Sequence, residues 1–397
     1  MSKDLIHQKK FRIGIVGTGF IAAGLSVALR SSRDLSVSRV LTRRDRSSIT
    51  NIAEPITGSV NELLENSDLI VECSGDIVHG AEVVDAALER GLPVVTMGSE
   101  FHATVGSYFA ARGLITEAEG DQPGSLAALH EEVVQMGFKP LVYGNIKGFL
   151  NHNPTIQDMN FWAKQNGISV PQVTSFTDGT KLQIEQVLVA NGLGAKIAKQ
   201  GMFGLRDMEL SEAASILGKE AKRLGSPISD YVINPKLPAG VFIVCEHPTE
   251  RPEVLKYLKL GEGPFYTLLR PYHLCHLEMT RTIRRVLSGQ PPLLNNGMHP
   301  HATVIPIAKR DLAAGHLIEM AIGGTELRGE AVEIEEAPNS PPLGLLSGAR
   351  LRTSVQQGQI LQLSDVDIPE SLAKRAWEAT HHATMRSAIP YSPALVS

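Results

Sequence analysis

Residues 11–24 (FRIGIVGTGFIAAG) constrain the fold more strongly than any other part of the sequence. The apolar start predicts a buried strand, the glycines a tight turn, and the Ala-rich end a helix. Gly17, Gly19 and Ala22 have the spacing G-x-G-x-x-A, which allows the turn, close approach of a phosphate and close helix–strand packing. The pattern predicts a dinucleotide site at the helix N-terminus, the alternative being a tight turn without a ligand. The predicted contacts here are Gly17, Thr18, Gly19, Phe20 and Ile21.

The composition of the 397 residues is ordinary for a soluble globular enzyme of two or three domains. A net charge of −4 gives no basic footprint for nucleic acid. Cys73, Cys245 and Cys275 lie far apart in apolar runs, which favours free thiols in a reducing cytosol. Residues 1–10 are polar and are expected to be a mobile tail, and no apolar run is long enough to span a membrane. We therefore expect a cytoplasmic protein that binds neither nucleic acid nor membrane.

The end of the second predicted strand, residues 35–41, bears on cofactor choice. In NAD-specific folds an acidic residue near this position binds the ribose 2′-hydroxyl. Here Thr42, Arg43 and Arg44 follow the strand, and two guanidinium groups suit a 2′-phosphate. The sequence thus predicts NADP(H) in preference to NAD(H), although Asp45 weakens the contrast. The alternative is that the two arginines are only a solvated surface pair.

Helices and strands alternate through the first part of the chain, which predicts a doubly wound parallel sheet, a Rossmann fold. Small residues follow the strand at residues 68–73, where a backbone would pass close to the cofactor. A turn at residues 119–124 leads into another helix and is expected to lie along the nicotinamide. The further cofactor contacts predicted from these two places are Cys73, Ser74, Gly75, Glu119 and Gly120.

The pattern changes after residue 138. Mixed helices and strands, one strand expected near residues 173–176, predict an α+β substrate domain with a largely antiparallel sheet. Short strands and glycine turns predict a small β-rich C-terminal module. The predicted divisions are a tail at 1–10, a dinucleotide-binding domain at 11–138, a catalytic domain at 139–296, the β-rich module at 297–369, and a helix and tail at 370–397.

A helix expected to begin near residue 180 carries the strongest candidates for acid–base chemistry. Lys181 and Glu185 are four residues apart and share a helix face, and Asp178 is expected to reach the same ammonium. A positioned lysine can stabilise and protonate the oxygen of a carbonyl that is being reduced. The alternative is an ordinary surface Glu–Lys pair, which is common on helices.

A third stretch, residues 270–278 (RPYHLCHLE), joins a strand to a helix. Arg270 suits a carboxylate or phosphate, and Tyr272 and His273 can bind hydroxyls. His273 and His276 lack the further ligands of a metal site, so no metal is predicted. With Lys147 and Asn191, the predicted substrate-binding residues are Lys147, Asn191, Arg270, Tyr272 and His273.

These stretches resemble homoserine-dehydrogenase-like NAD(P) oxidoreductases with a C-terminal SAF module. The most specific pieces are FTDGTKLQIEQVLVANGLG at 176–194 and LKLGEGPFYTLLRPYHLCHLE at 258–278. AKRDLAAGHLIE and VQQGQIL look like SAF turns, and TEAEGDQPG at 116–124 is similar to the nicotinamide-lining loop of homoserine dehydrogenases. That family places Asp and Lys as D-x-x-x-K, whereas Asp178 and Lys181 are D-x-x-K. The resemblance nevertheless favours a catalytic Lys181.

The resemblance implies an NADP(H)-dependent oxidoreductase acting on a carbonyl or alcohol of a small, polar, polyhydroxylated substrate, with phosphorylated and nucleotide-linked substrates among the alternatives. One branch is similar to 1-deoxy-D-xylulose 5-phosphate reductoisomerase, which makes 2-C-methyl-D-erythritol 4-phosphate; this chain is more compact than that branch before residue 66. A non-catalytic NADP-binding sensor is the other alternative. A homo-oligomer, dimer or tetramer, is expected.

Overall fold

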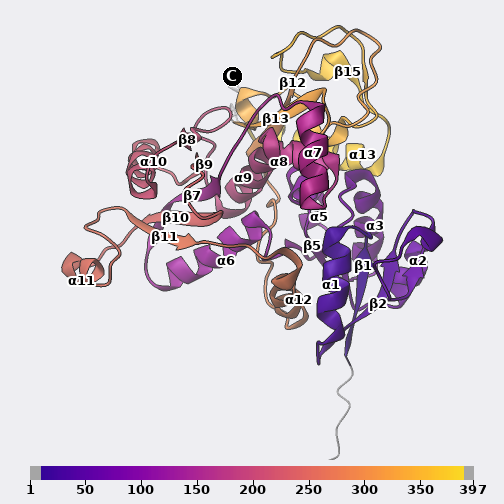
Figure 1. Cartoon of the computed structure of the whole chain (residues 1–397), viewed down its shortest axis with the longest axis horizontal. Helices are drawn as coiled ribbons and strands as arrows, with labels where there is room; N and C mark the ends of the chain where they lie inside the picture. The colour runs from indigo at the N-terminus through magenta and orange to yellow at the C-terminus, as the bar shows by residue number, and fades with distance from the viewer. Residues whose placement is uncertain (1–9, 389–397) are drawn as a thin grey trace, which may run out of the picture.

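The structure is a computed structural model that describes residues 10–388. The tails predicted at the two ends of the chain fall, apart from Lys10, outside the described residues. Figure 1 shows three regions: a sheet with the earliest helices, a second sheet beside it, and a C-terminal region above both.

The first sheet is six-stranded and entirely parallel, in the order β3-β2-β1-β4-β5-β6. The strand order reverses direction between β1 and β4, which is the arrangement of dinucleotide-binding folds. The prediction of a doubly wound parallel sheet is confirmed. The strands are β1 Phe11–Val16, β2 Leu35–Leu41, β3 Ile56–Thr57, β4 Leu69–Glu72, β5 Val94–Thr96 and β6 Ile115–Glu117.

Buried apolar runs explain why this sheet is covered on both faces. Ile13, Ile15 and Val16 of β1 are fully buried, as expected of a central parallel strand. Separate apolar clusters lie on the two faces, one including Leu25 of α1 and the other Val84 of α3. The helical segments are α1 Phe20–Arg30, α2 Val60–Glu65, α3 Ile77–Glu89, α4 Ser99–Phe101, the π-helical turn η2 His102–Gly106, and α5 Ser107–Ala110.

The second sheet has the order β11-β10-β7-β9-β8. It is mixed rather than largely antiparallel, because β9 runs parallel to both β7 and β8. The strands are β7 Lys139–Lys147, β8 Leu205–Arg206, β9 Ile228–Ile233, β10 Gly240–Glu246 and β11 Tyr266–Arg270. The accompanying helices are α6 Gln122–Gln135, α9 Thr180–Leu193, α10 Leu210–Leu224 and α11 Pro252–Tyr257, whereas α12 Met279–Leu287 packs in the α1 cluster of the first sheet.

The strand predicted near residues 173–176 is wrong, because these residues lie in helix α8, Val170–Thr177. Ser169 and Gln172 form a reciprocal capping box and Pro171 occupies the first turn. These are strong helix-start signals, and they outweigh the local β-propensity. The preceding helix, α7 Ile156–Asn166, ends at Gly167 in the left-handed conformation.

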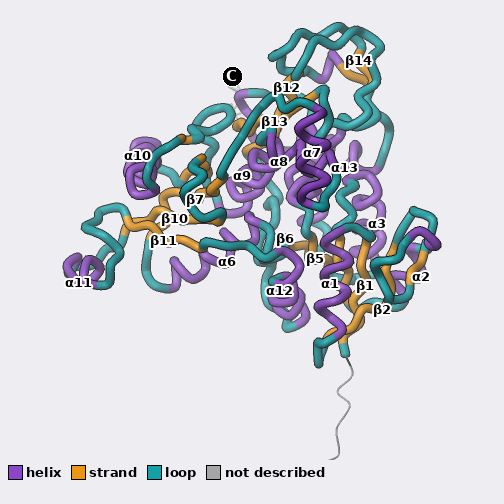
Figure 2. Tube along the Cα trace, in the orientation of Figure 1, coloured by secondary structure: helices purple, strands orange, loops and turns teal. Residues whose placement is uncertain are grey.

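The C-terminal module packs against one side of α9. The hairpin of β12 Ala302–Ala308 and β13 Leu327–Glu333 packs on this helix, and the Gly329 amide donates to Thr180 Oγ1 at 3.0 Å. Figure 2 shows that most of the module is loop. The short strands β14 Arg350–Leu351 and β15 Val366–Asp367 pair with each other, and α13 Leu372–Ala388 returns to pack on α3 and α5.

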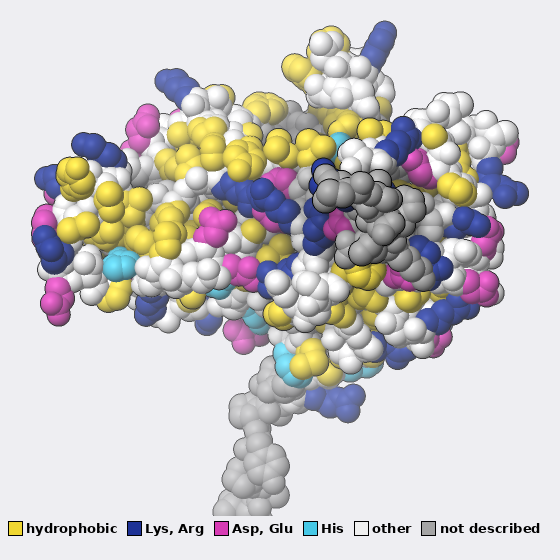
Figure 3. Space-filling model, turned by 90° about the horizontal axis from the view of Figure 1, so that it is seen from below, with side chains coloured by type: hydrophobic (Ala, Val, Ile, Leu, Met, Phe, Trp, Pro, Cys, Tyr) yellow, Lys and Arg dark blue, Asp and Glu magenta, His cyan; other side chains and the backbone are white. Residues whose placement is uncertain are grey.

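The surface mixes charges of both signs. Figure 3 shows acidic and basic side chains interspersed over one face, with apolar side chains gathered over part of it. Between residues 10 and 388, no helix combines the length and apolar character that a membrane crossing requires.

Candidate active site

The turn after β1 leaves room for a ligand at the point where the strand order reverses. Gly17 has φ +108°, and a Cβ placed on it would lie 2.9 Å from Ser74 Cα, so only glycine fits there. A Cβ placed on Gly19 would meet nothing within 4 Å. Gly19 also begins α1 without a side-chain cap, which leaves the first helical N–H groups of Phe20 and Ile21 available to an anion. The residues predicted around this turn therefore fit a dinucleotide pyrophosphate.

The neighbouring strand end supplies the other side of the crevice. Cys73 is buried and its thiol contacts Val16 O at 3.4 Å, while Gly75 borders open space. The Ser74 amide donates to Glu72 Oε1 at 2.9 Å. Burial raises the pKa of Glu72 to about 7, against the opposing effect of the Ser74 hydrogen bonds.

The residues predicted to select the cofactor lie at the end of β2. Thr42 is buried, and its hydroxyl accepts the Arg44 amide at 3.1 Å. The Arg43 and Arg44 side chains are exposed, and Arg43 forms an ion pair with Asp76, the N-cap of α3. A 2′-phosphate would therefore compete with Asp76 for Arg43.

Lys181 lies in a buried group of polar side chains at the carboxyl ends of β5 and β6. Its Nζ donates to Ser99 Oγ at 2.7 Å and Glu100 Oε2 at 2.9 Å, and lies 3.6 Å from Asp121 Oδ2. The Lys181 side chain is only 12% exposed. Because three acidic or hydroxylic partners surround it, this lysine is not the ordinary surface pair that was the alternative.

A second row of polar side chains joins this group from β7 and α6. Lys147 Nζ donates to Gln122 Oε1 at 2.8 Å and lies 3.6 Å from Glu185 Oε2. Asn145 Nδ2 donates to the same Glu185 oxygen at 3.2 Å, and His273 Nε2 lies 3.4 Å from Gln122 Nε2. We call the whole set the Lys181 cluster: Ser99, Glu100, Asp121, Gln122, Asn145, Lys147, Lys181, Glu185 and His273.

The electrostatics of the cluster keep Lys181 charged. Burial alone would lower the pKa of Lys181, but Asp121, Glu100 and Glu185 outweigh it and raise that pKa. Burial raises the pKa of Asp121 in turn, yet the Lys181 charge reverses this and the net pKa is lowered. Burial dominates at Glu185 and raises its pKa to about 7. The cluster therefore holds the Lys181 ammonium near the Asp121 carboxylate, whose pKa is lowered, and the Glu185 carboxyl, whose pKa is about 7.

Three buried side chains near the cluster, those of Thr96, His102 and Glu117, are joined by hydrogen bonds. Thr96 Oγ1 donates to Glu117 Oε2 at 2.5 Å and lies 2.8 Å from His102 Nε2. All three side chains are fully buried. Burial raises the pKa of Glu117 well above its ordinary value and lowers that of His102 to about 3.

Asp178 and Asn191, predicted as site residues, instead connect α9 to neighbouring segments. The Asp178 carboxylate accepts the Thr180 amide at 2.9 Å and forms an ion pair with Lys309, so the prediction that it reaches Lys181 is wrong. Asp178 precedes α9, and its carboxylate binds a backbone N–H of the first turn of that helix. The Asn191 amide oxygen accepts two backbone N–H groups, and its nitrogen donates to Asn296 and Ala302 O, each at 3.0 Å. Asn191 thus has no free group for a substrate.

Arg270 is likewise already paired. Its buried guanidinium contacts Glu119 at 2.7 Å and also Glu278, and Arg281 binds the same Glu119 oxygen at 2.7 Å. Neither Arg270 as a substrate ligand nor Glu119 as a cofactor ligand is supported by these contacts. Tyr272 lies over the Arg270 guanidinium, 5.3 Å from it, and is half exposed.

Gly120 fixes the loop in place. It has φ +110°, and a Cβ on it would lie 2.2 Å from Cys275 O. The same compact turn brings Asp121 to Lys181 and Gln122 to Lys147. Sequence reasoning assigned no role to Asp121, Gln122 or Asn145, although polar residues at the ends of predicted strands were a usable signal.

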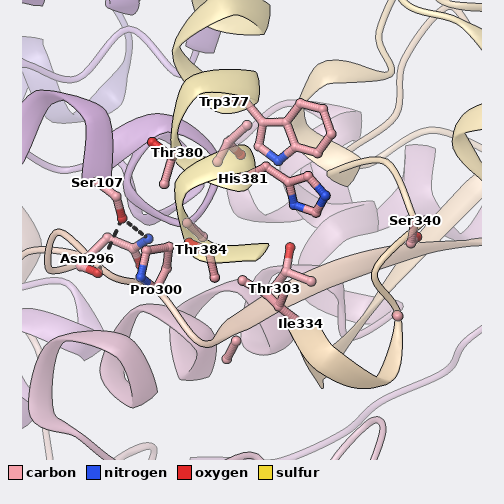
Figure 4. A pocket seen from close by; sticks show the side chains of 14 residues that line it. Ser107, Asn296, Pro300, Thr303, Ile334, Ser340, Trp377, Thr380, His381 and Thr384 are labelled. Atoms are coloured by element: carbon pink, nitrogen blue, oxygen red, sulfur yellow. Dashed lines mark hydrogen bonds between the residues drawn. The ribbon is translucent and has the colours of Figure 1, made fainter. Parts of the chain in front are cut away.

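The cavity in Figure 4 lies elsewhere, between α13, η2 and β12. Trp377 and His381 from one helix form part of its wall, opposite Ser107 and Asn296, which are hydrogen-bonded to each other. No acidic side chain, lysine or arginine lines it, so we do not place acid–base chemistry there. Within residues 10–388 no group of three or more His, Cys, Asp or Glu side chains could hold a metal ion.

Two family models match the chain. Residues 17–111 match "Homoserine dehydrogenase, NAD binding domain", and residues 120–279 match "Oxidoreductase DRL, catalytic domain". The first match contains the glycine turn and the second contains Asp121 through His273 of the Lys181 cluster. The two models identify an NAD(P)-dependent oxidoreductase.

Three further similarities are more distant. A segment of 74 residues, 18% of this chain and 22% of the relative, is 31% identical to meso-diaminopimelate D-dehydrogenase of Acetivibrio thermocellus. The chain thus matches about a fifth of that relative's length. A probable dehydrogenase of Thermotoga maritima is 14% identical, with 72% of this chain and 91% of that chain covered and a TM-score of 0.40. A myo-inositol dehydrogenase of Corynebacterium glutamicum is 11% identical, with 71% and 90% covered and a TM-score of 0.42.

Proposed function

We propose that this NAD(P)-dependent oxidoreductase interconverts a carbonyl and an alcohol on a small polar substrate, with the Lys181 ammonium at the reacting oxygen. The observation that carries the proposal is the position of Lys181. It is a nearly buried cation at the carboxyl edge of β5 and β6, held by Ser99, Glu100 and Asp121. Ligands of open α/β sheets bind along this edge.

The chemistry follows from charge. When bound, the dinucleotide exchanges a hydride with the substrate carbon. Negative charge develops on the carbonyl oxygen as it is reduced, and a preorganised ammonium stabilises that charge and then supplies a proton. The raised pKa of Lys181 keeps the proton in place until the oxygen becomes basic. Glu185, with a pKa of about 7, is placed to return a proton to the cluster.

The proposed substrate is polyhydroxylated. Asn145 Oδ1 and His273 Nδ1 have no hydrogen-bond partner among the described residues and suit hydroxyls, and Lys147, 20% exposed, suits a phosphate on the same molecule. We include NADP(H) over NAD(H) in the proposal, because Arg43 and Arg44 follow β2 where the 2′-phosphate would lie. A homo-oligomer and an SAF-like role for the C-terminal module also belong to the proposal.

The test begins with the cofactor. NADPH and NADH are titrated into the full chain and into the single variants Arg43→Ala and Arg44→Ala. The proposal predicts at least tenfold tighter binding of NADPH, reduced in both variants, because each charged hydrogen bond contributes about 1–3 kcal/mol. Equal binding of the two cofactors would remove the NADP assignment. No binding of either would remove the oxidoreductase assignment.

A substrate panel follows, with NADPH oxidation as the readout. It includes hydroxyaldehydes, hydroxyketones, their phosphates and 1-deoxy-D-xylulose 5-phosphate. A reductoisomerase is the second candidate, because the catalytic domain, residues 139–296, is similar to that branch. Carbon labelling separates the two: a rearranged skeleton in the product indicates isomerisation before reduction, and an unchanged skeleton indicates simple carbonyl reduction.

A further inference from the structure

A cleft outside the Lys181 cluster lies where α7 and α8 meet the C-terminal module. It encloses about 120 Å³. For comparison, a cavity of about 150 Å³ accepts a molecule the size of benzene. None of its nine lining residues belongs to the Lys181 cluster.

The two halves of the cleft differ in chemistry. Pro154, Ile156 and Met159 make an apolar side, and Lys309 and Arg310 stand on the polar side with Asn153, Thr174 and Thr325. No acidic side chain is among the lining residues. The cleft therefore offers positive charge and hydrogen-bond donors at one end and apolar contact at the other.

Both cations retain donors for a ligand. Lys309 Nζ donates to Asp178 Oδ2 and, at 2.8 Å, to Gly324 O, which uses two of its three hydrogens. Arg310 lies 3.7 Å from Glu326 Oε1 and makes no side-chain hydrogen bond to the part of the chain that the structure describes. The Arg310 side chain is half exposed. Asp178 and Glu326 lie behind the two cations and do not line the cleft.

We propose that this cleft binds a small organic anion, with its carboxylate or phosphate head against Lys309 and Arg310 and a short apolar body against Ile156 and Met159. Arginine suits such a head because its planar fork can donate two parallel hydrogen bonds. The site is separate from the chemistry yet joined to it. Lys309 holds Asp178, Asp178 caps the Thr180 amide, and Lys181 follows in the same first turn of α9.

Binding is tested on the full chain with n-butyrate, n-butyl phosphate and n-butylammonium, by ligand-observed NMR titration. The three probes have short straight alkyl bodies, propyl in n-butyrate and butyl in the other two, and differ in the head. We expect at least one anion to bind, and n-butylammonium to bind at least tenfold more weakly than that anion. The tighter anion identifies the preferred head. Failure of both anions to bind, or equal binding of the amine, overturns the proposal.

Variants locate the site. Arg310→Gln is expected to weaken anion binding at least tenfold. Arg352→Gln is the matched control, because Arg352 is similarly exposed and ion-paired on the same module but lies outside the cleft, and it should change the affinity less than twofold. Lys147→Gln should also keep the wild-type affinity. Wild-type affinity in Arg310→Gln, or loss in Lys147→Gln, overturns the assignment, the latter by moving the anion to the Lys181 cluster. The result leaves the proposed oxidoreductase activity untouched.

Discussion

The glycine turn after β1 and the Lys181 cluster are both polar sites at the same sheet edge, but they are built differently. The turn uses backbone N–H groups and empty space over Gly19. The cluster uses charged side chains from four separate segments, packed so that Lys181 is 12% exposed. A site for binding phosphates needs access and donors, whereas a site for proton transfer needs fixed, desolvated charge. The predictions below test this division, from the largest expected effect to the smallest.

Removing the ammonium should affect turnover far more than cofactor binding. We predict that Lys181→Met lowers kcat by about 10²–10⁴-fold, the usual contribution of a positioned proton donor. Turnover on the substrate found in the panel, measured beside circular dichroism to verify folding, checks this. A kcat within threefold of wild type would show that the chemistry lies elsewhere.

Lys309, which pairs with the residue before α9, provides a contrast to Lys181. Lys309 is also buried and paired with an acid, Asp178, but outside the cluster. We predict that Lys309→Met costs about 3–5 kcal/mol of unfolding free energy, because it leaves Asp178 buried and unpaired. In the fraction that folds, kcat should stay within tenfold of wild type. Urea unfolding measures the first quantity, and a hundredfold loss of kcat in folded protein would contradict the distinction.

Substitutions at the two glycines of the turn should affect different properties, stability at Gly17 and dinucleotide binding at Gly19. Gly17→Ala is expected to lose about 1–3 kcal/mol of stability, because its φ is +108° and the new Cβ meets Ser74. Gly19→Val should leave stability within about 0.5 kcal/mol, since its side chain enters open space. It should nevertheless weaken dinucleotide binding at least tenfold. Thermal unfolding and cofactor titration separate the two, and equal stability losses would contradict the geometry.

The last prediction concerns how the stability of the protein depends on pH. Glu72 has a folded pKa of about 7, raised by burial above its ordinary value of 4.5. Its proton-bound form is therefore favoured by folding, so this contribution to stability is complete below pH 4.5 and is lost as pH rises through 7. We predict that wild type loses up to about 3 kcal/mol relative to Glu72→Gln between pH 4.5 and 8. If the free energies of unfolding of the two proteins differ by the same amount at every pH in this range, the raised pKa of Glu72 is contradicted.

Local patterns predicted the first sheet well. The glycine turn, α1 and β2 could be predicted because each is encoded within a dozen neighbouring residues. The strand predicted at 173–176 failed because a capping box outside those residues sets the helix. The mixed direction of the second sheet depends on which strands pair across long connections, and no local pattern specifies that.

The candidate site was predictable only in part. Lys181 and Glu185 were found from their spacing on one helix, and Lys147 and His273 from the residue types that bind polar substrates. Asp178, Asn191 and Arg270 have suitable chemistry, but tertiary partners occupy them. Conversely, Asp121 and Asn145 become significant only because the fold brings β7 against the loop before α6.

The most direct test of the division between the two regions is one NADPH titration, followed by nicotinamide fluorescence, on wild type, Gly19→Val and Lys181→Met. The account predicts that wild type and Lys181→Met bind NADPH with affinities within about threefold, and that Gly19→Val binds at least tenfold more weakly. Wild-type affinity in Gly19→Val, together with lost binding in Lys181→Met, would contradict it, because the phosphates would then depend on the cluster and not on the turn.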